Sequence, residues 1–155
     1  MTHKTNVMRL LDQKKIRYKS YSYYDTDAVS GIDVVNKLNL NPDQVFKTLV
    51  TVGKSGEYYV FLVPVSRELD LKKASSISKE KSIEMIKSKD LFPLTGYIHG
   101  GCSPIGMKKK FPVTIDESSN KFETIIFNAG KIGYQIEISL RDLKKIIDFS
   151  LENIV

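Results

Sequence analysis

The chain has 155 residues, of which 41% are hydrophobic and 27% charged, a length and balance typical of one globular domain with its own core. Its 24 Lys and Arg exceed its 18 Asp and Glu, and the net charge of +6 favours a polyanionic partner. One cysteine and two histidines exclude an internal disulfide, a thiolate zinc cluster and a histidine-rich metal site, and no apolar run is long enough to cross a bilayer, so we expect a soluble, cytoplasmic domain over residues 1–155 without metal or cofactor.

The N-terminal part predicts two helices with a strand between them. Thr5 suits an N-cap, and apolar residues recur at helical spacing from there to about Lys14. Alternation over 16–23 predicts a short strand. Residues 30–38 predict a second amphipathic helix, which the turn signal at 41–42 ends.

Two strongly apolar runs, 46–52 and 57–65, are separated by the sequence Gly-Lys-Ser-Gly. Apolar runs of this length around a short glycine-containing loop are typical of a β-hairpin. The stretches 69–78 and 81–88 then read as short helices with lysines on their solvated faces.

The C-terminal part predicts four more strands, over 97–99, 113–116, 124–127 and 134–138. Ser139, with Asp142 three positions later, resembles a capping box. The helix that it opens has an apolar stripe reaching Leu151.

Strands and helices do not alternate strictly, and at least one hairpin is present. This order favours an α+β fold with one mixed, mostly antiparallel sheet flanked by helices over a doubly wound parallel sheet.

Lys47 stands out because alternation places it with Leu49 and Thr51 on a mostly apolar strand face. Periodicity alone favours a strand-end lysine that reaches water. The functional reading is a cation aimed into a pocket, where it would bind a phosphate or a developing oxyanion.

The glycine-rich stretch 100–106 does not match a known catalytic motif. It lacks the Gly-Lys-Ser/Thr ending of a Walker A loop, and Pro104 removes a backbone donor. His99 and Ser103 could form a base and nucleophile pair, but no carboxylate is recognisably placed to orient the histidine. Cys102 likewise lacks an identifiable base and is interpreted as a packed thiol.

Three segments together resemble the YbaK family of the prolyl-tRNA editing superfamily: LNLNPDQVFKTLV at 38–50, TGYIHGGCSPIGMKKKFP at 95–112 and NAGKIGYQIEI at 128–138. They occur in the family's order and the resemblance spans nearly the whole chain. It implies a barrel-like mixed sheet with surrounding helices. It also implies a trans-acting enzyme that removes cysteine from tRNA(Pro), and from tRNA(Cys) as well.

The resemblance also assigns site residues. The lysine of the FKT motif, the expected catalytic residue, is Lys47. A tyrosine late in the first strand belongs to the pocket; Tyr23 fits best by spacing, and Tyr21 and Tyr24 are alternatives. The remaining substrate-binding residues are Thr48, Gly100, Gly101, Ser103, Asn128, Gly130 and Gln135, and the residues expected to contact tRNA are Lys108, Lys109, Lys110 and Lys131.

Five positions depart from the family pattern. Asn128-Ala129-Gly130 replaces Ser-Gly-Gly, and Ile132 stands where a second basic residue is common. Gln135 occupies a position that is often acidic, and Cys102 replaces a common isoleucine. These changes bear on fine specificity more than on the reaction class.

The expected mechanism needs no protein nucleophile, since the substrate thiol can attack its own ester and form a thiolactone. Lys47 and backbone N–H groups of the glycine loops would stabilise the oxyanion. The alternatives are an Ala-tRNA(Pro) deacylase of the same superfamily and a non-catalytic RNA-binding or regulatory module. A monomer is the default, with prolyl-tRNA synthetase as a partner that would supply tRNA selectivity.

Overall fold

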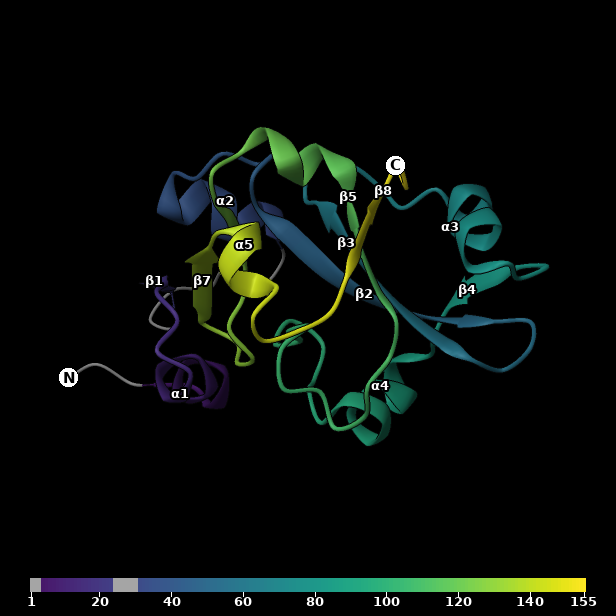
Figure 1. The fold of residues 1–155 in the computed structure, drawn as a ribbon, viewed down its shortest axis with the longest axis horizontal. Helices are drawn as coiled ribbons and strands as arrows, with labels where there is room; N and C mark the ends of the chain where they lie inside the picture. The colour runs from purple at the N-terminus through teal and green to yellow at the C-terminus, as the bar shows by residue number, and fades with distance from the viewer. Residues whose placement is uncertain (1–3, 24–30) are drawn as a thin grey trace.

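The computed structural model describes residues 4–23 and 31–155, and within them two β-sheets carry helices on their faces (Figure 1). The helices are α1 (Asn6–Gln13), α2 (Gly31–Leu38), α3 (Leu71–Ser78), α4 (Ser88–Thr95), the 3₁₀ helix η1 (Glu117–Lys121) and α5 (Leu140–Leu143). The strands are β1 (Lys19–Ser22), β2 (Phe46–Gly53), β3 (Tyr58–Pro64), β4 (Ile83–Met85), β5 (Val113–Asp116), β6 (Ile125–Asn128), β7 (Tyr134–Ile138) and β8 (Ser150–Glu152). None of the helices in these ranges has the length and apolar character needed to span a membrane.

The smaller sheet has the order β1-β7-β6 and is antiparallel throughout. The larger sheet has the order β4-β2-β3-β5-β8, antiparallel from β4 to β3 and parallel from β3 to β8. The α+β class and the mostly antiparallel pairing are therefore confirmed.

A short seam joins the two sheets. Val45, just before β2, forms a parallel bridge with Ile126 of β6. The Ile126 N–H donates to the Gln44 carbonyl at 3.1 Å, and the Val65 N–H donates to the Val45 carbonyl at 2.8 Å. The sheets thus continue into each other at one place without closing into a complete barrel.

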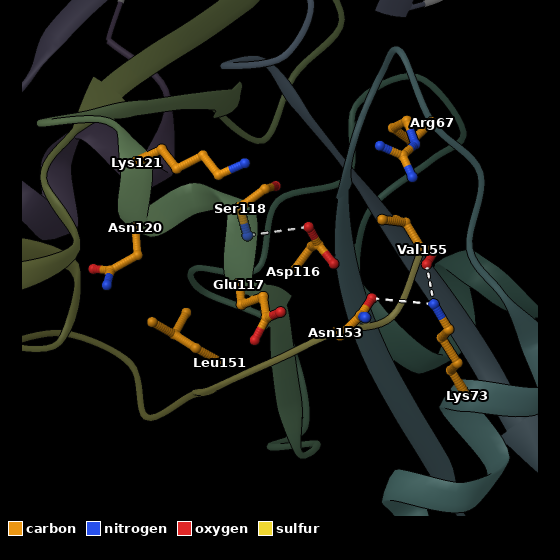
Figure 2. A pocket seen from close by; sticks show the side chains of 10 residues that line it. All are labelled: Arg67, Lys73, Asp116, Glu117, Ser118, Asn120, Lys121, Leu151, Asn153 and Val155. Atoms are coloured by element: carbon orange, nitrogen blue, oxygen red, sulfur yellow. Dashed lines mark hydrogen bonds between the residues drawn. The ribbon is translucent and has the colours of Figure 1, made fainter.

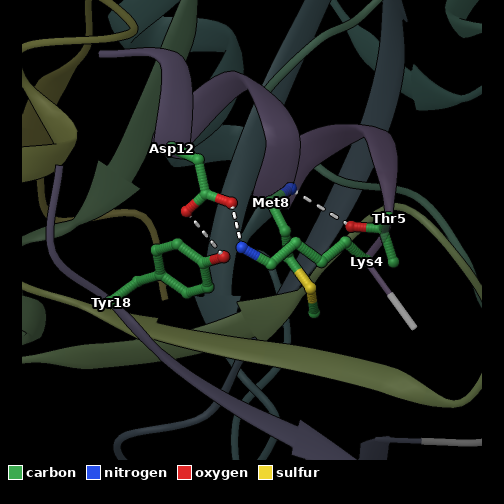
Figure 3. Close-up of polar contacts among 5 residues, drawn as sticks. All are labelled: Lys4, Thr5, Met8, Asp12 and Tyr18. Atoms are coloured by element: carbon green, nitrogen blue, oxygen red, sulfur yellow. Dashed lines mark hydrogen bonds and ion pairs between the residues drawn. The ribbon is translucent and has the colours of Figure 1, made fainter. Parts of the chain in front are cut away.

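The first helix forms as its sequence predicts. The Thr5 hydroxyl accepts a hydrogen bond from the Met8 N–H at 3.2 Å, which satisfies one of the free donors of the first turn. On the outer face Lys4 pairs with Asp12, and Asp12 also accepts a hydrogen bond from the Tyr18 hydroxyl at 3.1 Å (Figure 3). The inner face buries its apolar residues in the main core.

Two predicted elements in the middle of the chain are wrong. Residues 81–88 contain strand β4 instead of a helix, because Ile83 is buried and its backbone pairs with the open edge of β2. The helix begins later, at Ser88, and continues through Pro93. Residues 97–99 form no strand; the Tyr97 side chain is buried and its hydroxyl donates to the Ile105 carbonyl at 2.5 Å.

The C-terminal helix is also shorter than predicted. Ser139 caps it as expected, accepting from the Asp142 N–H at 3.1 Å, but α5 ends at Leu143. Leu151 lies in β8, which pairs with the otherwise free edge of β5. Pairing along a sheet edge satisfies the backbone of 150–152 and overrides the helical periodicity of the side chains.

A polar chain crosses the seam between the sheets. The Glu137 carboxylate of β7 accepts hydrogen bonds from the Tyr21 hydroxyl and, at 2.5 Å, from the Thr124 hydroxyl. The Gln44 amide in turn donates to Thr124 Oγ1 at 3.1 Å. Burial by itself would raise the pKa of Glu137, but the hydrogen bonds from Thr124 and Tyr21 and the nearby Lys19 charge lower it overall.

We expect Glu137→Gln to reduce the free energy of unfolding by about 1–2 kcal/mol at pH 7, because charge-assisted hydrogen bonds are lost. A carboxyl whose pKa is lower in the folded state stabilises the protein above its ordinary pKa of 4.5 and loses that contribution as pH falls through the folded value. The difference in the free energy of unfolding between the wild type and Glu137→Gln should therefore shrink below pH 4.5, which denaturant titrations at several pH values measure. Glu84→Gln, at an exposed position on β4, is the matched control, and an undiminished difference at low pH would contradict the assignment.

Candidate functional site

The side chain of Asn128 holds two glycine turns together at the C-terminal end of β6. The first glycine turn is 98–101 and the second is 130–133. Asn128 Nδ2 donates to the Gly100 carbonyl at 2.9 Å, while Oδ1 accepts from the N–H groups of Gly130 at 2.7 Å and Lys131 at 3.1 Å. One carboxamide therefore fixes both turns relative to the sheet.

Glycine is required where these turns meet. A Cβ on Gly101 would lie 3.0 Å from the Ile132 nitrogen and 3.3 Å from the Lys131 carbonyl carbon, closer than a side chain ordinarily allows. Gly130 has φ +91°, a conformation that non-glycine residues rarely adopt. The two turns consequently approach each other through their backbones.

Tyr23 joins this assembly from the end of β1. Its N–H donates to the Gly133 carbonyl at 2.7 Å, and its hydroxyl oxygen lies 3.5 Å from Asn128 Nδ2. The Tyr21 hydroxyl instead donates to Glu137. Tyr23 is thus the tyrosine beside the turns, and Tyr24, the other alternative, lies outside the described residues.

Gln135 lies next to Asn128 in the sheet. It is the partner of Asn128 across β6–β7 and of Tyr21 across β1–β7, so the three side chains share one face. Its side chain is only 6% exposed, and Oε1 has no hydrogen-bond partner among residues 4–23 and 31–155. A buried acceptor left unpaired costs about 1–3 kcal/mol, which makes this oxygen a candidate for binding a donor on a ligand.

Lys47 projects from the same face of the joined sheets. Val45 and Lys47 are two residues apart in an extended segment, so their side chains lie on the same face. Val45 pairs with Ile126 at the seam. Ile126 and Asn128 in turn share a face of β6, which is also the face of Gln135. The seam therefore places Lys47 on the Asn128 side of the sheets.

The ammonium of Lys47 has one exposed partner. Nζ lies 3.1 Å from Glu68 Oε1; the Lys47 side chain is 28% exposed and that of Glu68 is 89% exposed. An ion pair with a carboxylate so accessible to water is worth about 0–1 kcal/mol, so it leaves the ammonium available to another anion.

Thr48 and Ser103 lie elsewhere. Thr48 alternates onto the opposite face of β2 from Lys47, where its Oγ1 is buried and has no partner in the described part of the chain. Ser103 is fully buried, and its hydroxyl accepts from the Ile105 N–H at 3.2 Å within its own loop.

Cys102 does not have the properties of a nucleophile. Burial raises the pKa of its thiol to about 12, so it stays protonated at neutral pH. The thiol packs in the main core with Tyr97 and Ile105.

Three of the eight backbone N–H groups in the glycine turns 98–101 and 130–133 are used by the protein itself. Gly101 N–H donates to the Ile98 carbonyl at 2.9 Å, and the Gly130 and Lys131 N–H groups donate to Asn128. The other five N–H groups of these turns have no acceptor among the described residues. The expectation that turn N–H groups stabilise an oxyanion therefore stays a prediction, with the Lys47 ammonium as a cation on the same face.

A cavity of about 270 Å³, the turn cavity, lies between the two glycine turns and is lined by residues 96–98, Gly101 and 130–132. Lys131 is exposed at its edge, with Nζ 5.9 Å from the centre of the Tyr134 ring. Lys108 lies beside Gly96, and Lys109 and Lys110 continue the exposed run. Of the four lysines predicted to contact tRNA, Lys131 thus lines the cavity and Lys108 lies beside one of its lining residues.

A larger hollow of about 670 Å³ lies near the C-terminus and contains none of the predicted site residues (Figure 2). Its walls carry both charge signs. Lys73 Nζ is 3.3 Å from Asn153 Oδ1, and Asp116 accepts from the Ser118 N–H at 3.1 Å. These contacts are internal and structural.

Glu68 and Ile98 were not predicted at the site, and Ile132, which the sequence showed as a departure from the family pattern, was not assigned a role there. The two isoleucines interrupt otherwise polar, glycine-rich turns, and this was the available signal. Glu68 carries no local signal, because its contact with Lys47 depends on the pairing of β2 with β3.

Comparison with known proteins identifies the family. Residues 26–146 match the model of the aminoacyl-tRNA editing domain. The chain is 46% identical, over 88% of its own length and 84% of the other protein's, to the proposed Cys-tRNA(Pro)/Cys-tRNA(Cys) deacylase EbsC of Enterococcus faecalis. It is also 24% identical over 117 residues to a proline–tRNA ligase of Kosmotoga olearia, of which it covers 20%.

Solved structures agree on the fold. A crystal structure described as a proposed trans-editing enzyme for prolyl-tRNA synthetase superimposes with a TM-score of 0.83 at 20% identity, covering 99% of this chain and 98% of that one. A hypothetical protein superimposes with a TM-score of 0.87 at 15% identity, over 97% of this chain and 99% of that one.

Asn128 variants should separate the two turns. We expect Asn128→Ala to speed hydrogen exchange of the Gly101, Gly130 and Lys131 amides by tenfold or more, because all of its anchoring bonds are lost. Asn128→Asp keeps the acceptor for the second turn but cannot donate to the Gly100 carbonyl, so only the first turn is released. In this variant only the exchange of the Gly101 amide should become faster. Exchange measured by NMR tests this, with Asn120→Ala on η1 as control; unchanged rates in Asn128→Ala would refute the anchoring role.

Proposed function

The chain belongs to the aminoacyl-tRNA editing domain family, and from this premise we propose that it is a trans-acting editing enzyme that deacylates Cys-tRNA(Pro), and also Cys-tRNA(Cys). The proposal rests above all on the likeness to EbsC over most of both chains. The site supports it, since Lys47, Asn128 and Gln135 share one face and Cys102 has no nucleophilic character.

The reaction proposed is an intramolecular displacement. The sulfur of the cysteinyl group attacks its own ester carbonyl, a C–S bond forms, and the C–O bond to the terminal ribose breaks. The thiol proton is transferred to the departing ribose oxygen, which gives a free tRNA end and cysteine thiolactone. Because attacker and carbonyl belong to one molecule, the protein contributes by holding the reactive conformer and stabilising charge.

Lys47 is the proposed catalytic residue, with its ammonium stabilising the oxyanion formed as the sulfur adds. Its weak pairing with exposed Glu68 supports this role, because little free energy is lost when the ammonium turns to the substrate. The N–H groups of the two turns that have no acceptor in the described part of the chain are proposed to assist the lysine.

Gln135 is the proposed acceptor for the substrate's α-ammonium group. Its buried, unpaired Oε1 lies on the Lys47 face, and an ammonium donor would satisfy it. The remaining substrate contacts are proposed for Tyr23, Gly100, Gly101 and Gly130. Thr48 and Ser103 are proposed to support the site from the core side, Thr48 behind β2 and Ser103 within the loop that follows the first glycine turn.

We propose further that the protein works as a single-domain monomer in the cytoplasm, where tRNA is charged. Its likeness to a segment of a proline–tRNA ligase supports prolyl-tRNA synthetase as the partner that selects tRNA.

We expect Lys47→Ala to slow deacylation of Cys-tRNA(Pro) by about a hundredfold, the usual cost of one oxyanion donor. Single-turnover assays with mass analysis for the thiolactone measure this. Lys54→Ala, an exposed lysine in the β2–β3 turn, and Cys102→Ala should both stay near wild type. Full activity in Lys47→Ala, or wild-type preference for Ala-tRNA(Pro), would reject this version of the function.

We expect Gln135→Leu to slow deacylation of Cys-tRNA(Pro) about tenfold but to leave N-acetyl-Cys-tRNA(Pro) unaffected, because the acetylated amine has no ammonium to bind. Gln135→Glu should retain activity, since a carboxylate also accepts from an ammonium. Equal losses on both substrates would mean that Gln135 has only a structural role.

A further inference from the structure

The turn cavity has a different chemistry from the face that carries Lys47. Its lining contains no carboxylate and no carboxamide among the described residues. The Tyr97 hydroxyl is already bound to the Ile105 carbonyl, and three glycines expose backbone instead of side chains. Such a cavity accepts a flat, weakly polar group better than an amino-acid ester.

Two isoleucines border the cavity and face water. Ile98 is 53% exposed and Ile132 is 40% exposed. Ile98 lies in the first glycine turn and Ile132 in the second, so they approach the cavity from its two sides. Apolar side chains that border a cavity and remain this exposed are typical of a binding surface.

Positive charge lies at the edge of the same cavity. Lys131 belongs to its lining, and Lys108 lies beside Gly96, with Lys109 and Lys110 following. These lysines are exposed, and within the described residues none of them has a carboxylate partner. An apolar slot with unpaired cations at its edge suits a nucleotide, whose base is flat and whose phosphate is anionic.

We propose that the turn cavity seats the 3′-terminal nucleoside of the tRNA, with the base between Ile98 and Ile132 and the adjoining phosphates near Lys131 and Lys108. This inference rests on the proposed function, which places the aminoacyl group on the Lys47 side of Asn128. The ribose would then lie at Asn128, where the first glycine turn meets the sheet.

The volume of the turn cavity fits a nucleoside better than it fits the cysteinyl side chain. A volume of about 270 Å³ is close to the lower end, ~300 Å³, of sites that hold small organic ligands, whereas the CH₂SH group of cysteine would leave most of it empty. The departures from the family pattern at Ile132 and from Ser-Gly-Gly at Asn128-Ala129-Gly130 then fall on the nucleoside side of the site.

Binding of 5′-AMP tests the cavity without any assay of activity. In NMR titrations of the isoleucine methyl groups we expect saturable shifts at Ile98 and Ile132, and much weaker shifts with ribose 5-phosphate, which lacks the base. Ile132→Glu should abolish the AMP response at Ile98 by placing a carboxylate beside the base and phosphate. Met85→Glu, at a position 48% exposed on β4, is the matched control and should leave it intact.

Kinetics with Cys-tRNA(Pro) give the second measurement. We expect Ile132→Glu and Ile98→Glu each to raise KM about tenfold with little change in kcat, the loss anticipated when a stacked base is displaced. Met85→Glu should leave both constants unchanged.

The outcomes distinguish the two proposals. Absence of deacylation by the wild type would reject the proposed function while the AMP titration still reports on the cavity. Absence of saturable shifts, equal shifts with ribose 5-phosphate, or an unchanged AMP response in a folded Ile132→Glu protein would overturn the nucleoside seat. A loss confined to kcat would overturn it as well, because it would place the cavity at the reacting ester.

Discussion

The carboxamide of Asn128 is the contact on which the geometry of the site depends. A carboxamide offers donors and acceptors in one plane, and here the donor side binds the first glycine turn while the acceptor side binds the second. The second turn is also the connection of the β6–β7 hairpin, and the Tyr23 N–H binds its Gly133 carbonyl, whereas the first turn lies outside any strand or helix. A serine hydroxyl in this place could not satisfy both turns in the same way, so the carboxamide itself has a structural meaning.

The seam between the sheets is the second constraint. The bridge between Val45 and Ile126 aligns β2 with β6 and so puts Lys47, Asn128 and Gln135 on one face, although they come from distant parts of the chain. The polar chain through Gln44, Thr124 and Glu137 crosses the same seam. Stability of the fold and placement of the lysine are thereby linked.

The arrangement suits a reaction in which the substrate provides its own nucleophile. The protein supplies one accessible ammonium, one buried unpaired carbonyl oxygen and rigid walls, while its own thiol is kept protonated by burial. A reactive side chain would be a disadvantage in such a site, because it would also attack correctly charged esters. Selectivity then rests on the substrate's thiol and on how the tRNA end is held.

The sequence by itself determined the fold class, the β2–β3 hairpin and the first helix, because these depend on local periodicity and capping, and its motifs pointed to Lys47, Tyr23 and Asn128. Strand β4, the β8 pairing of Leu151 and the irregular course of 97–99 were decided by open sheet edges and by burial, which involve residues far apart in the chain. The same holds for the contacts of Asn128 with both glycine turns and for the cavity between the turns. Only the tertiary structure could decide these, because a hydrogen-bond donor is free or occupied according to partners that no local pattern reveals.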